Sequence, residues 1–271
     1  MTAGIVGLGL IGGSLAKAYH EAGEAVLAFD TDRSILDFAM MSGAVDGVLD
    51  EESIKRCDIV LIAVYPAACI EYFTRMADYI NKDTVVLDCC GTKRTVCEGC
   101  FPVAKAHGIA FAGGHPMAGT HNSGFKYARA NLFHGAPMVI VPMDFDNIAL
   151  LSRIEKLLAP AGFGSFSVTT AAEHDRMIAF TSQLAHVASN AYIKSPTAKL
   201  HKGFSAGSYK DMTRVAWLAP HMWAELFMEN KEFLLKEIDC YIEHLSEYKT
   251  AMEHDDEETL IRLLDEGKKR K

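Results

Sequence analysis

The sequence lacks any apolar run long enough to cross a membrane. The longest, from about Ile59 to Tyr65, falls far short of the roughly 20 residues that a membrane-spanning helix needs. Basic charge is also scarce: 27 Lys and Arg stand against 35 Asp and Glu, for a net charge of -8. This balance argues against nucleic acid and acidic membranes as partners. Since the N-terminus starts directly with a strand pattern, we expect no signal or transit peptide and a cytoplasmic protein.

The seven cysteines are expected to be free thiols, as in a reducing compartment. Cys97 and Cys100 form a CxxC pair, with Cys89 and Cys90 upstream, which raises the question of a metal or redox site. Adjacent cysteines are a poor start for a tetrahedral zinc site, no second CxxC follows, and a thioredoxin-like context is absent. We therefore expect structural thiols and no bound metal.

A glycine-rich segment at residues 7–12, Gly-Leu-Gly-Leu-Ile-Gly, follows the apolar strand pattern of residues 3–6 and opens a helix. We expect Gly7 to make the tight turn, Gly9 to let the backbone approach a pyrophosphate, and Gly12 to pack helix against strand. Free N–H groups at the helix N-terminus would bind the phosphates. With a strand before it and a helix after it, the segment is a specific dinucleotide-binding signal.

The second strand pattern, at residues 25–29, leads into Asp30, where a carboxylate can accept both ribose hydroxyls of NAD. The same carboxylate would repel the 2′-phosphate of NADP, so we expect NAD as the cofactor. Arg33 is the counter-evidence, because an arginine just past the strand can pair with that phosphate. The expected cofactor-binding residues are Gly7, Gly9, Leu10, Ile11, Gly12, Asp30, Val64 and Thr92.

A histidine stands in a second glycine-rich segment, residues 113–119, which read Gly-Gly-His-Pro-Met-Ala-Gly. The segment follows an apolar run at 109–112, so His115 would lie at the carboxyl end of a strand, the edge where open α/β sheets bind ligands. With an ordinary pKa near 6.5, His115 could act as a general base at neutral pH. The alternative is a histidine bonded to backbone in a tight loop, and the upstream glycine-rich segment favours the catalytic role.

Strands and helices alternate through residues 1–170, which predicts an α/β domain with a Rossmann-type doubly wound sheet. From residue 171 to residue 271 strand patterns vanish, and helices are expected at 172–193, 209–218, 221–246 and 257–266. The stretch from Trp223 to Leu245 is richly apolar on one side, and such a helix usually buries that side against a partner. We therefore expect an all-helical C-terminal dimerisation domain and a homodimer.

The predicted helical domain carries polar residues of its own. Lys210 and Arg214 are four apart and share one helix face, so they could form an anion site, with Asp211 available to orient one of them. An exposed charged pair at this spacing is common and usually idle. His186, inside the long apolar helix, would by default be a core histidine with its hydrogen bonds satisfied.

Taken in order along nearly the whole chain, these motifs resemble the TyrA family, the prephenate and arogenate dehydrogenases of tyrosine biosynthesis. The segments that carry the resemblance are residues 7–14, 88–93, 114–120, 174–176, 182–186 and 210–214, followed by Trp223. The resemblance implies an NAD-dependent enzyme with no separate metal that works as a dimer through its helical domain.

The resemblance also implies a reaction, the oxidative decarboxylation of prephenate to 4-hydroxyphenylpyruvate. His115 matches the catalytic histidine, which accepts the proton of the ring 4-hydroxyl while hydride leaves the same carbon for the nicotinamide. Arg214 matches the arginine that grips a substrate carboxylate, and His186 matches a second active-site histidine. The other implied substrate-binding residues are Thr120, His121, Lys210 and Asp211, and Gly207 and Trp223 match positions at or near the dimer interface.

Two departures from the family pattern bear on rate and substrate. Gly91 stands where relatives usually have a serine, and Cys90 or Thr92 could replace its hydrogen bond. His121 stands where relatives usually have an acidic or amide-bearing residue. A histidine can donate to a keto acid but gives the ammonium of arogenate no counter-charge, which favours prephenate.

Two other interpretations stay open. One is a dehydrogenase of arogenate or of another cyclohexadienyl acid, and the other is a catalytically weak NAD-binding regulator that has kept the fold. The presence of His115, Arg214 and Asp30 together argues against the regulator, because a decayed site loses such residues freely.

Overall fold

The computed structural model describes residues 1–120 and 122–270 of the chain. The chain divides into two compact units: one holds Met1–Asp175 with Leu218–Met222, and the other holds Arg176–Trp217 with the chain from Trp223 onward. The first unit contains the sheet, and the described part of the second consists of helices and their connections. The domain boundary expected at residue 170 stays a prediction.

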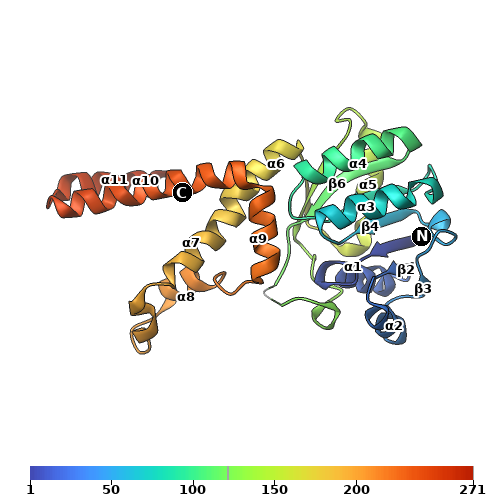
Figure 1. Ribbon diagram of the computed structural model, residues 1–271, viewed down its shortest axis with the longest axis horizontal. Coiled ribbons are helices and arrows are strands. Elements are labelled where there is room, and N and C mark those ends of the chain that lie inside the picture. Colours follow the sequence, from blue (N-terminus) through green and yellow to red (C-terminus); the bar gives the residue numbers. More distant parts are fainter. Residues whose placement is uncertain (121, 271) are drawn as a thin grey trace. The chain divides into compact units, whose positions relative to one another are not determined.

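An eight-stranded sheet forms the centre of the first unit (Figure 1). Its order is β3-β2-β1-β4-β5-β6-β7-β8, and β1 to β6 run parallel in the order of a Rossmann fold, which confirms the predicted fold class. The strands are β1 (Thr2–Val6), β2 (Ala25–Phe29), β3 (Gly47–Val48), β4 (Ile59–Ile62), β5 (Val85–Asp88), β6 (Ala110–Pro116), β7 (Pro137–Pro142) and β8 (Ser165–Val168).

The last two strands reverse direction. β7 runs antiparallel to β6, and β8 runs parallel to β7. In its described part, the segment between β6 and β7 contains only the short turn η3 (Phe125–Tyr127) and no crossover helix. Without a crossover the chain re-enters the sheet from the edge at which it left, which makes the pair antiparallel. The sheet is therefore mixed at this end, a feature that the strand patterns did not specify.

Helices cover both faces of the sheet (Figure 1). One core cluster joins α1, α2 and α5 to one face, and a second joins α3 and α4 to the other. Successive strand residues point to opposite faces, so Ile5 belongs to the first cluster and Val6 to the second. The helices and short turns are α1 (Leu10–Glu21), α2 (Arg33–Met41), η1 (Ile54–Arg56), α3 (Pro66–Met76), η2 (Ala77–Tyr79), α4 (Arg94–His107), α5 (Ile148–Leu157) and η4 (Ala159–Ala161).

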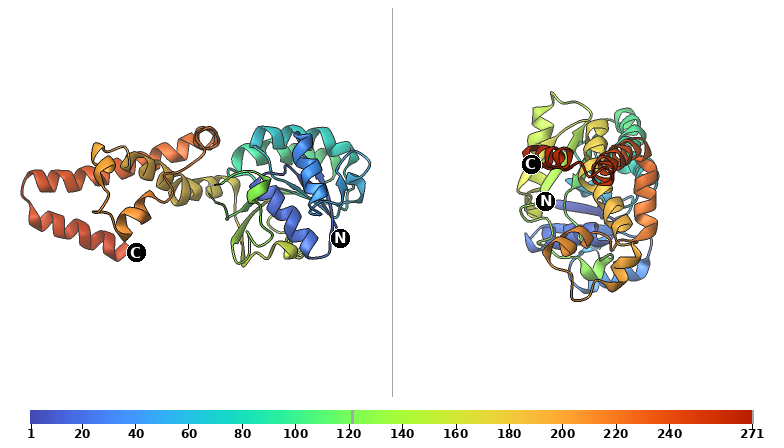
Figure 2. Two further views of the ribbon diagram at one scale, coloured as in Figure 1. Left: turned by 90° about the horizontal axis from the view of Figure 1, so that it is seen from below. Right: turned by 90° about the vertical axis from the view of Figure 1, so that its left-hand side faces the viewer.

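Helices dominate the chain after β8. They are α6 (Ala171–Ile178), η5 (Ala179–Leu184, a π-helical segment), α7 (Ala185–Tyr192), η6 (Pro196–Leu200), α8 (Gly207–Thr213), α9 (Pro220–Glu229), α10 (Lys231–Glu253) and α11 (Glu257–Arg270). α10 and α11 lie side by side and run antiparallel (Figure 2). Within residues 1–120 and 122–270, no helix has both the length and the apolarity to span a membrane.

Three predicted helices differ in detail from those observed. The helix expected at 209–218 begins at Gly207 and ends at Thr213. The helix expected at 172–193 contains the π-helical segment η5, and the helix expected at 221–246 breaks at Asn230, between α9 and α10. Two buried amides mark these irregularities: Asn230 Nδ2 donates to Gln183 Oε1 (2.8 Å), and Gln183 Nε2 donates to Leu226 O (3.1 Å). A buried amide must find hydrogen-bonding partners, and these two find them in each other and in the last turn of α9.

Candidate active site

The candidate site of the first unit lies where the parallel strands end. Gly7 follows β1, Asp30 follows β2, Val64 follows β4, Asp88 ends β5, and His115 lies near the end of β6. Because these strands run parallel, their carboxyl ends share one edge, the edge at which open α/β sheets bind ligands. The topology thus brings together residues that lie far apart along the chain.

Each glycine of the glycine-rich loop meets a different constraint. Gly7 has a φ of 85°, in the left-handed region that favours glycine, and its amide donates to Phe29 O (2.8 Å). A Cβ on Gly12 would lie 1.8 Å from the carbonyl oxygen of Gly7, so α1 approaches the turn too closely for any side chain. A Cβ on Gly9 would meet no atom within 4 Å. Space is therefore open beside Gly9, as the approach of a pyrophosphate requires.

The N-terminus of α1 also suits an anion. Gly9 is its N-cap and offers no side-chain hydrogen bond to the first turn, which begins with the half-buried Leu10 and Ile11. The N–H groups of a first turn have no partner within the helix, and the helix dipole favours negative charge there. The loop and the helix together fit the pyrophosphate of a dinucleotide.

Asp30 is held in place by backbone groups. Leu8 N donates to Oδ2 (2.7 Å) and Asp32 N donates to Oδ1 (2.9 Å). Arg33, the alternative partner for a 2′-phosphate, is exposed, and its Nε pairs with Asp37 Oδ1 at 2.9 Å, one turn along α2. This arrangement favours ribose binding by Asp30 over phosphate binding by Arg33.

A buried ion pair joins Asp88 to Lys93 behind the site, and neither side chain is exposed. Asp88 Oδ1 accepts from Gly114 N (3.1 Å), the residue before His115, and Oδ2 accepts from Cys90 N (2.9 Å). Burial opposes the charge of Lys93, but the charge of Asp88, the hydrogen bond to it and the nearby Cys90 and Cys97 together outweigh that effect and raise the pKa of Lys93 above its ordinary value. The raised pKa favours the charged form of Lys93, close to His115.

The seven cysteines are free, as expected. Of the two residues that could replace the missing serine at Gly91, Cys90 donates its thiol to Val64 O (3.2 Å) and belongs to the core under α3 and α4. Thr92 is buried in the loop before α4. Replacement of the serine's hydrogen bond by Cys90 or Thr92 stays a prediction.

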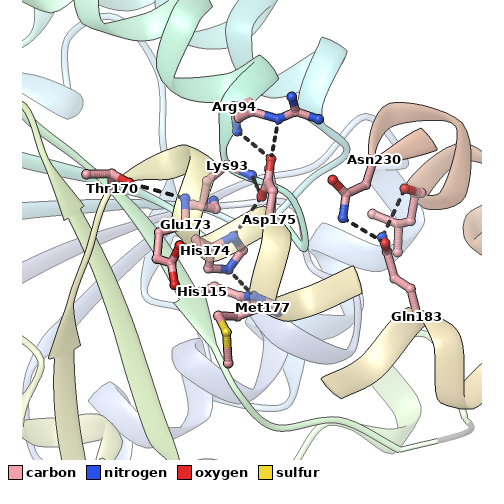
Figure 3. A network of polar contacts seen from close by, with 12 residues as sticks. Lys93, Arg94, His115, Thr170, Glu173, His174, Asp175, Met177, Gln183 and Asn230 are labelled. Carbon is pink, nitrogen blue, oxygen red and sulfur yellow. Dashed lines mark hydrogen bonds and ion pairs between the residues drawn. The ribbon is translucent and has the colours of Figure 1, made fainter. Parts of the chain in front are cut away.

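His115 lies at the end of a hydrogen-bonded chain of three side chains (Figure 3). Its Nδ1 lies 2.8 Å from Nε2 of His174, and Nδ1 of His174 lies 2.7 Å from Oδ1 of Asp175. Asp175 also accepts from the backbone N–H groups of Lys93 (2.7 Å) and Arg94 (2.9 Å). The half-buried His115 is thus bonded to a second histidine. A purely structural histidine in a tight loop is expected to bond to the backbone instead.

The surroundings favour neutral histidines. Burial, then His174 and Lys93, lower the pKa of His115 well below its ordinary value. Burial also lowers the pKa of His174, although Asp175 opposes this effect. For Asp175, burial opposes ionisation, but hydrogen bonds from His174, Arg94 and Lys93 outweigh it and hold its pKa below the ordinary value. A neutral imidazole has a lone pair, so His115 can act as a general base at pH 7.

No function was predicted from the sequence for His174 or Asp175. His174 lies 59 residues from His115, in a helical stretch where a histidine is by default a core residue. The available signal was the adjacent His-Asp pair at the start of a helix, in a segment that already contributed to the family resemblance.

In the second unit, His186 is a half-buried acceptor. Its Nδ1 lies 2.9 Å from Ser182 O; a carbonyl oxygen can only accept, so Nδ1 carries the hydrogen and Nε2 the lone pair. The ring stacks on Trp223 with centroids 3.7 Å apart. Burial lowers the pKa of His186; Arg214 acts in the same direction and the bond to Ser182 against it.

The other expected substrate-binding residues are exposed where the structure describes them. Lys210 and Asp211 lie on α8, and Arg214 is its C-cap, one turn beyond Lys210. Thr120 is exposed, and its Oγ1 accepts from Asn122 N (3.2 Å). His121 lies outside the described residues, so its expected role stays a prediction.

A Rossmann-type sheet with an open phosphate loop and a neutral histidine at its binding edge defines a class, the nucleotide-dependent dehydrogenases. Two family models then match the chain: the nucleotide-binding domain of prephenate dehydrogenase over residues 15–165, and the dimerization domain of prephenate dehydrogenase over residues 170–266. The chain belongs to the prephenate dehydrogenase family. The expected family and enzyme class are confirmed.

Individual relatives agree with this assignment. A prephenate dehydrogenase of Lactococcus lactis is 28% identical over 273 residues, which cover 98% of this chain and 75% of the relative. A crystal structure of Synechocystis arogenate dehydrogenase matches with a TM-score of 0.83 and 26% identity, over 100% of this chain and 98% of the other. The structure of Aquifex aeolicus prephenate dehydrogenase with hydroxyphenyl propionate and NAD+ matches with a TM-score of 0.85 and 26% identity, over 100% and 96%.

Alanine should act differently at Gly9 and at Gly12. Gly9→Ala should keep the melting temperature of the wild type, because its Cβ meets open space, but should raise the Kd for NAD by about tenfold or more, or ~1.4 kcal/mol. Gly12→Ala should destabilise the fold by about 1–3 kcal/mol or more, because its Cβ overlaps the carbonyl of Gly7. Thermal unfolding and fluorescence titration with NAD measure the two effects, and an unchanged Kd in Gly9→Ala would contradict the pyrophosphate assignment.

Proposed function

We propose that the chain is an NAD-dependent dehydrogenase that converts prephenate to 4-hydroxyphenylpyruvate in tyrosine biosynthesis, with His115 as its general base. The observation that carries this proposal is His115 at the binding edge, hydrogen-bonded to His174 at 2.8 Å, in a chain of the prephenate dehydrogenase family. The Aquifex aeolicus relative, solved with hydroxyphenyl propionate and NAD+, supports the same cofactor and a similar ligand.

The proposed reaction moves a proton, a hydride and carbon dioxide. NAD, when bound, accepts the hydride from the carbon that carries the ring hydroxyl. His115 takes the hydroxyl proton, so that the oxygen can form a carbonyl as the hydride leaves. The ring carboxylate then departs as carbon dioxide and leaves its electron pair in the ring, which becomes aromatic as the oxygen regains a proton.

Arg214 is the proposed partner of a substrate carboxylate. It is exposed at the end of α8, and its guanidinium can hold a carboxylate through two parallel hydrogen bonds. Prephenate is preferred to arogenate in this proposal, because His121 offers the ammonium of arogenate no counter-charge. A dehydrogenase that accepts arogenate is the second candidate, favoured by the similarity to the Synechocystis enzyme.

A cytoplasmic homodimer is the proposed working form. Residues 170–266 match a dimerization domain, and exposed aromatic side chains lie in this region, among them Phe204 (92% exposed) and Trp217 (77% exposed). Apolar side chains so exposed are typical of a surface that a partner covers. The seven free cysteines are typical of a reducing compartment.

The activity itself is tested with purified protein, NAD and prephenate, by following NADH absorbance. We expect turnover in the wild type and a loss of about 10²–10⁴ in kcat for His115→Asn, with NAD binding retained. His107→Asn is the control, since His107 pairs with Asp78 at the end of α4. Near wild-type turnover in His115→Asn would return His115 to a structural role, and a higher kcat/KM for arogenate than for prephenate would favour the second candidate.

The pH dependence follows from the lowered pKa of His115. A base must be neutral to accept a proton. Because burial lowers the pKa of His115, its neutral form persists to a lower pH than that of an ordinary histidine. The acid limb of log kcat/KM should therefore lie below the ordinary histidine pKa of about 6.5 and disappear in His115→Asn. Steady-state rates from pH 5 to 8 measure the position of this limb. An acid limb with an apparent pKa above about 6.5 would contradict a base that is neutral at pH 7.

Cofactor choice should depend on Asp30. The wild type should prefer NAD, and Asp30→Ser should narrow the ratio of kcat/KM for NAD to that for NADP by about tenfold, because the charge facing the 2′-phosphate is removed. Arg33→Ala is the matched control: Arg33 pairs with Asp37, so its loss should leave NAD use unchanged. Equal kcat/KM values for NAD and NADP in the wild type would show that Asp30 does not discriminate between the two cofactors.

Arg214 should act mainly in substrate binding. Arg214→Gln should raise KM, with a loss of about 2–5 kcal/mol in kcat/KM, as for a truncated partner of a bound charge. Arg214→Lys should restore little, because lysine cannot reproduce the two parallel hydrogen bonds. If KM for prephenate stays unchanged in Arg214→Gln but rises in Lys210→Gln, the carboxylate partner is Lys210.

A further inference from the structure

The chain of His115, His174 and Asp175 fixes which ring nitrogens carry hydrogen (Figure 3). Asp175 accepts backbone N–H groups from Lys93 and Arg94, and Arg94 Nε lies 3.4 Å from its Oδ2. These donors hold Asp175 as a carboxylate, which can only accept. Nδ1 of His174 must therefore carry a hydrogen and donate it to Asp175.

The tautomer of His174 then sets that of His115. A neutral His174 has one N–H, which it gives to Asp175, so its Nε2 is an acceptor. Nδ1 of His115, 2.8 Å from that nitrogen, must be the donor. The lone pair of His115 then lies on Nε2, and this nitrogen takes the proton from the substrate hydroxyl.

We propose that His174 is a positioning residue that holds His115 in the tautomer with hydrogen on Nδ1, and that Asp175 in turn sets the tautomer of His174. The proposal rests on the proposed role of His115 as the base. The proton goes from the substrate hydroxyl to Nε2 of His115, and Asp175 stays a carboxylate throughout.

The same chain orients His115 after it has taken the proton. The N–H at Nδ1 stays directed at Nε2 of His174, so the ring keeps its position. The charged groups around the two rings are Lys93, paired with Asp88, and Asp175, paired with Arg94. Burial, His174 and Lys93 all lower the pKa of His115, so the hydrogen bond from Nδ1 positions the base and does not raise its pKa.

His174 gives a cleaner test than Asp175. Asp175 also holds the backbone at the start of α4, so its replacement would disturb the loop itself. His174→Leu removes the acceptor for His115, whereas His174→Gln keeps one in its side-chain oxygen. With NAD and prephenate, we expect His174→Leu to lower kcat by about 10- to 100-fold with little change in KM, and His174→Gln to stay within about tenfold of the wild type.

A spectroscopic readout separates positioning from mere structural support. In protein labelled with 15N-histidine, the His115 signals, identified by their loss in His115→Asn, should show a protonated Nδ1 and an unprotonated Nε2. His174→Leu should give shifts typical of mixed tautomers, and His174→Gln should keep those of the wild type. His107→Leu, at the far end of α4, is the control for histidine loss, and circular dichroism checks that each variant is folded.

Two results would overturn the proposal. Wild-type kcat in His174→Leu would show that the bond does not prepare the base. Equal losses in the leucine and glutamine variants, with unchanged His115 nitrogen shifts, would show a structural role only. If the wild type itself does not oxidise prephenate, the proposed function fails, while the nitrogen shifts of the wild type and of His174→Leu still decide the tautomer.

Discussion

The buried ion pair between Asp88 and Lys93 is the interaction on which the rest of the site depends. Neither side chain reaches solvent, so removal of one partner would leave an uncompensated buried charge, at a cost of about 3–5 kcal/mol. The same carboxylate accepts Gly114 N and Cys90 N, which ties the end of β5 to the strand that carries His115. A Cβ on Gly114 would lie 2.4 Å from Asp88 O, so the two strands approach as closely as glycine allows. The position of His115 follows from this contact.

Lys93 acts on His115 through two of its groups. Burial lowers the pKa of His115, and the Lys93 ammonium, a nearby positive charge, acts in the same direction and favours the neutral ring. The backbone N–H of Lys93 donates to Asp175, the carboxylate at the far end of the His174 chain, which orients His115. The proposed role of His115 as a general base requires both conditions, since a base must be neutral and correctly oriented when the substrate binds. The loop between β5 and α4 contributes to both from one residue.

The sequence predicted the parts of the fold and the site that depend on near neighbours. The glycine-rich loop, Asp30 and His115 each stand beside the strand that positions them, so a local pattern locates them. Contacts between residues far apart in the sequence could not be predicted in this way: His174 contacts His115, although the two are 59 positions apart in the chain. The hydrogen bond between the buried Gln183 and Asn230, at the break between α9 and α10, also joins residues that are far apart in the sequence. β7 runs antiparallel to β6 because the described part of the segment between them contains no crossover helix. The alternation of apolar residues within a strand does not indicate its direction.

The residues proposed to carry out the reaction differ in how they are held. His115 is fixed by a strand, a buried ion pair and a hydrogen-bonded chain, so its geometry exists before any ligand arrives. Arg214 ends a short helix and is exposed, and an exposed long side chain loses conformational freedom only when it binds. A prepared base lowers the barrier of the chemical step, whereas a carboxylate partner that becomes ordered on binding contributes mainly to selection of the ligand. The expected division of effects, with His115 and His174 acting on kcat and Arg214 on KM, follows from this difference in packing.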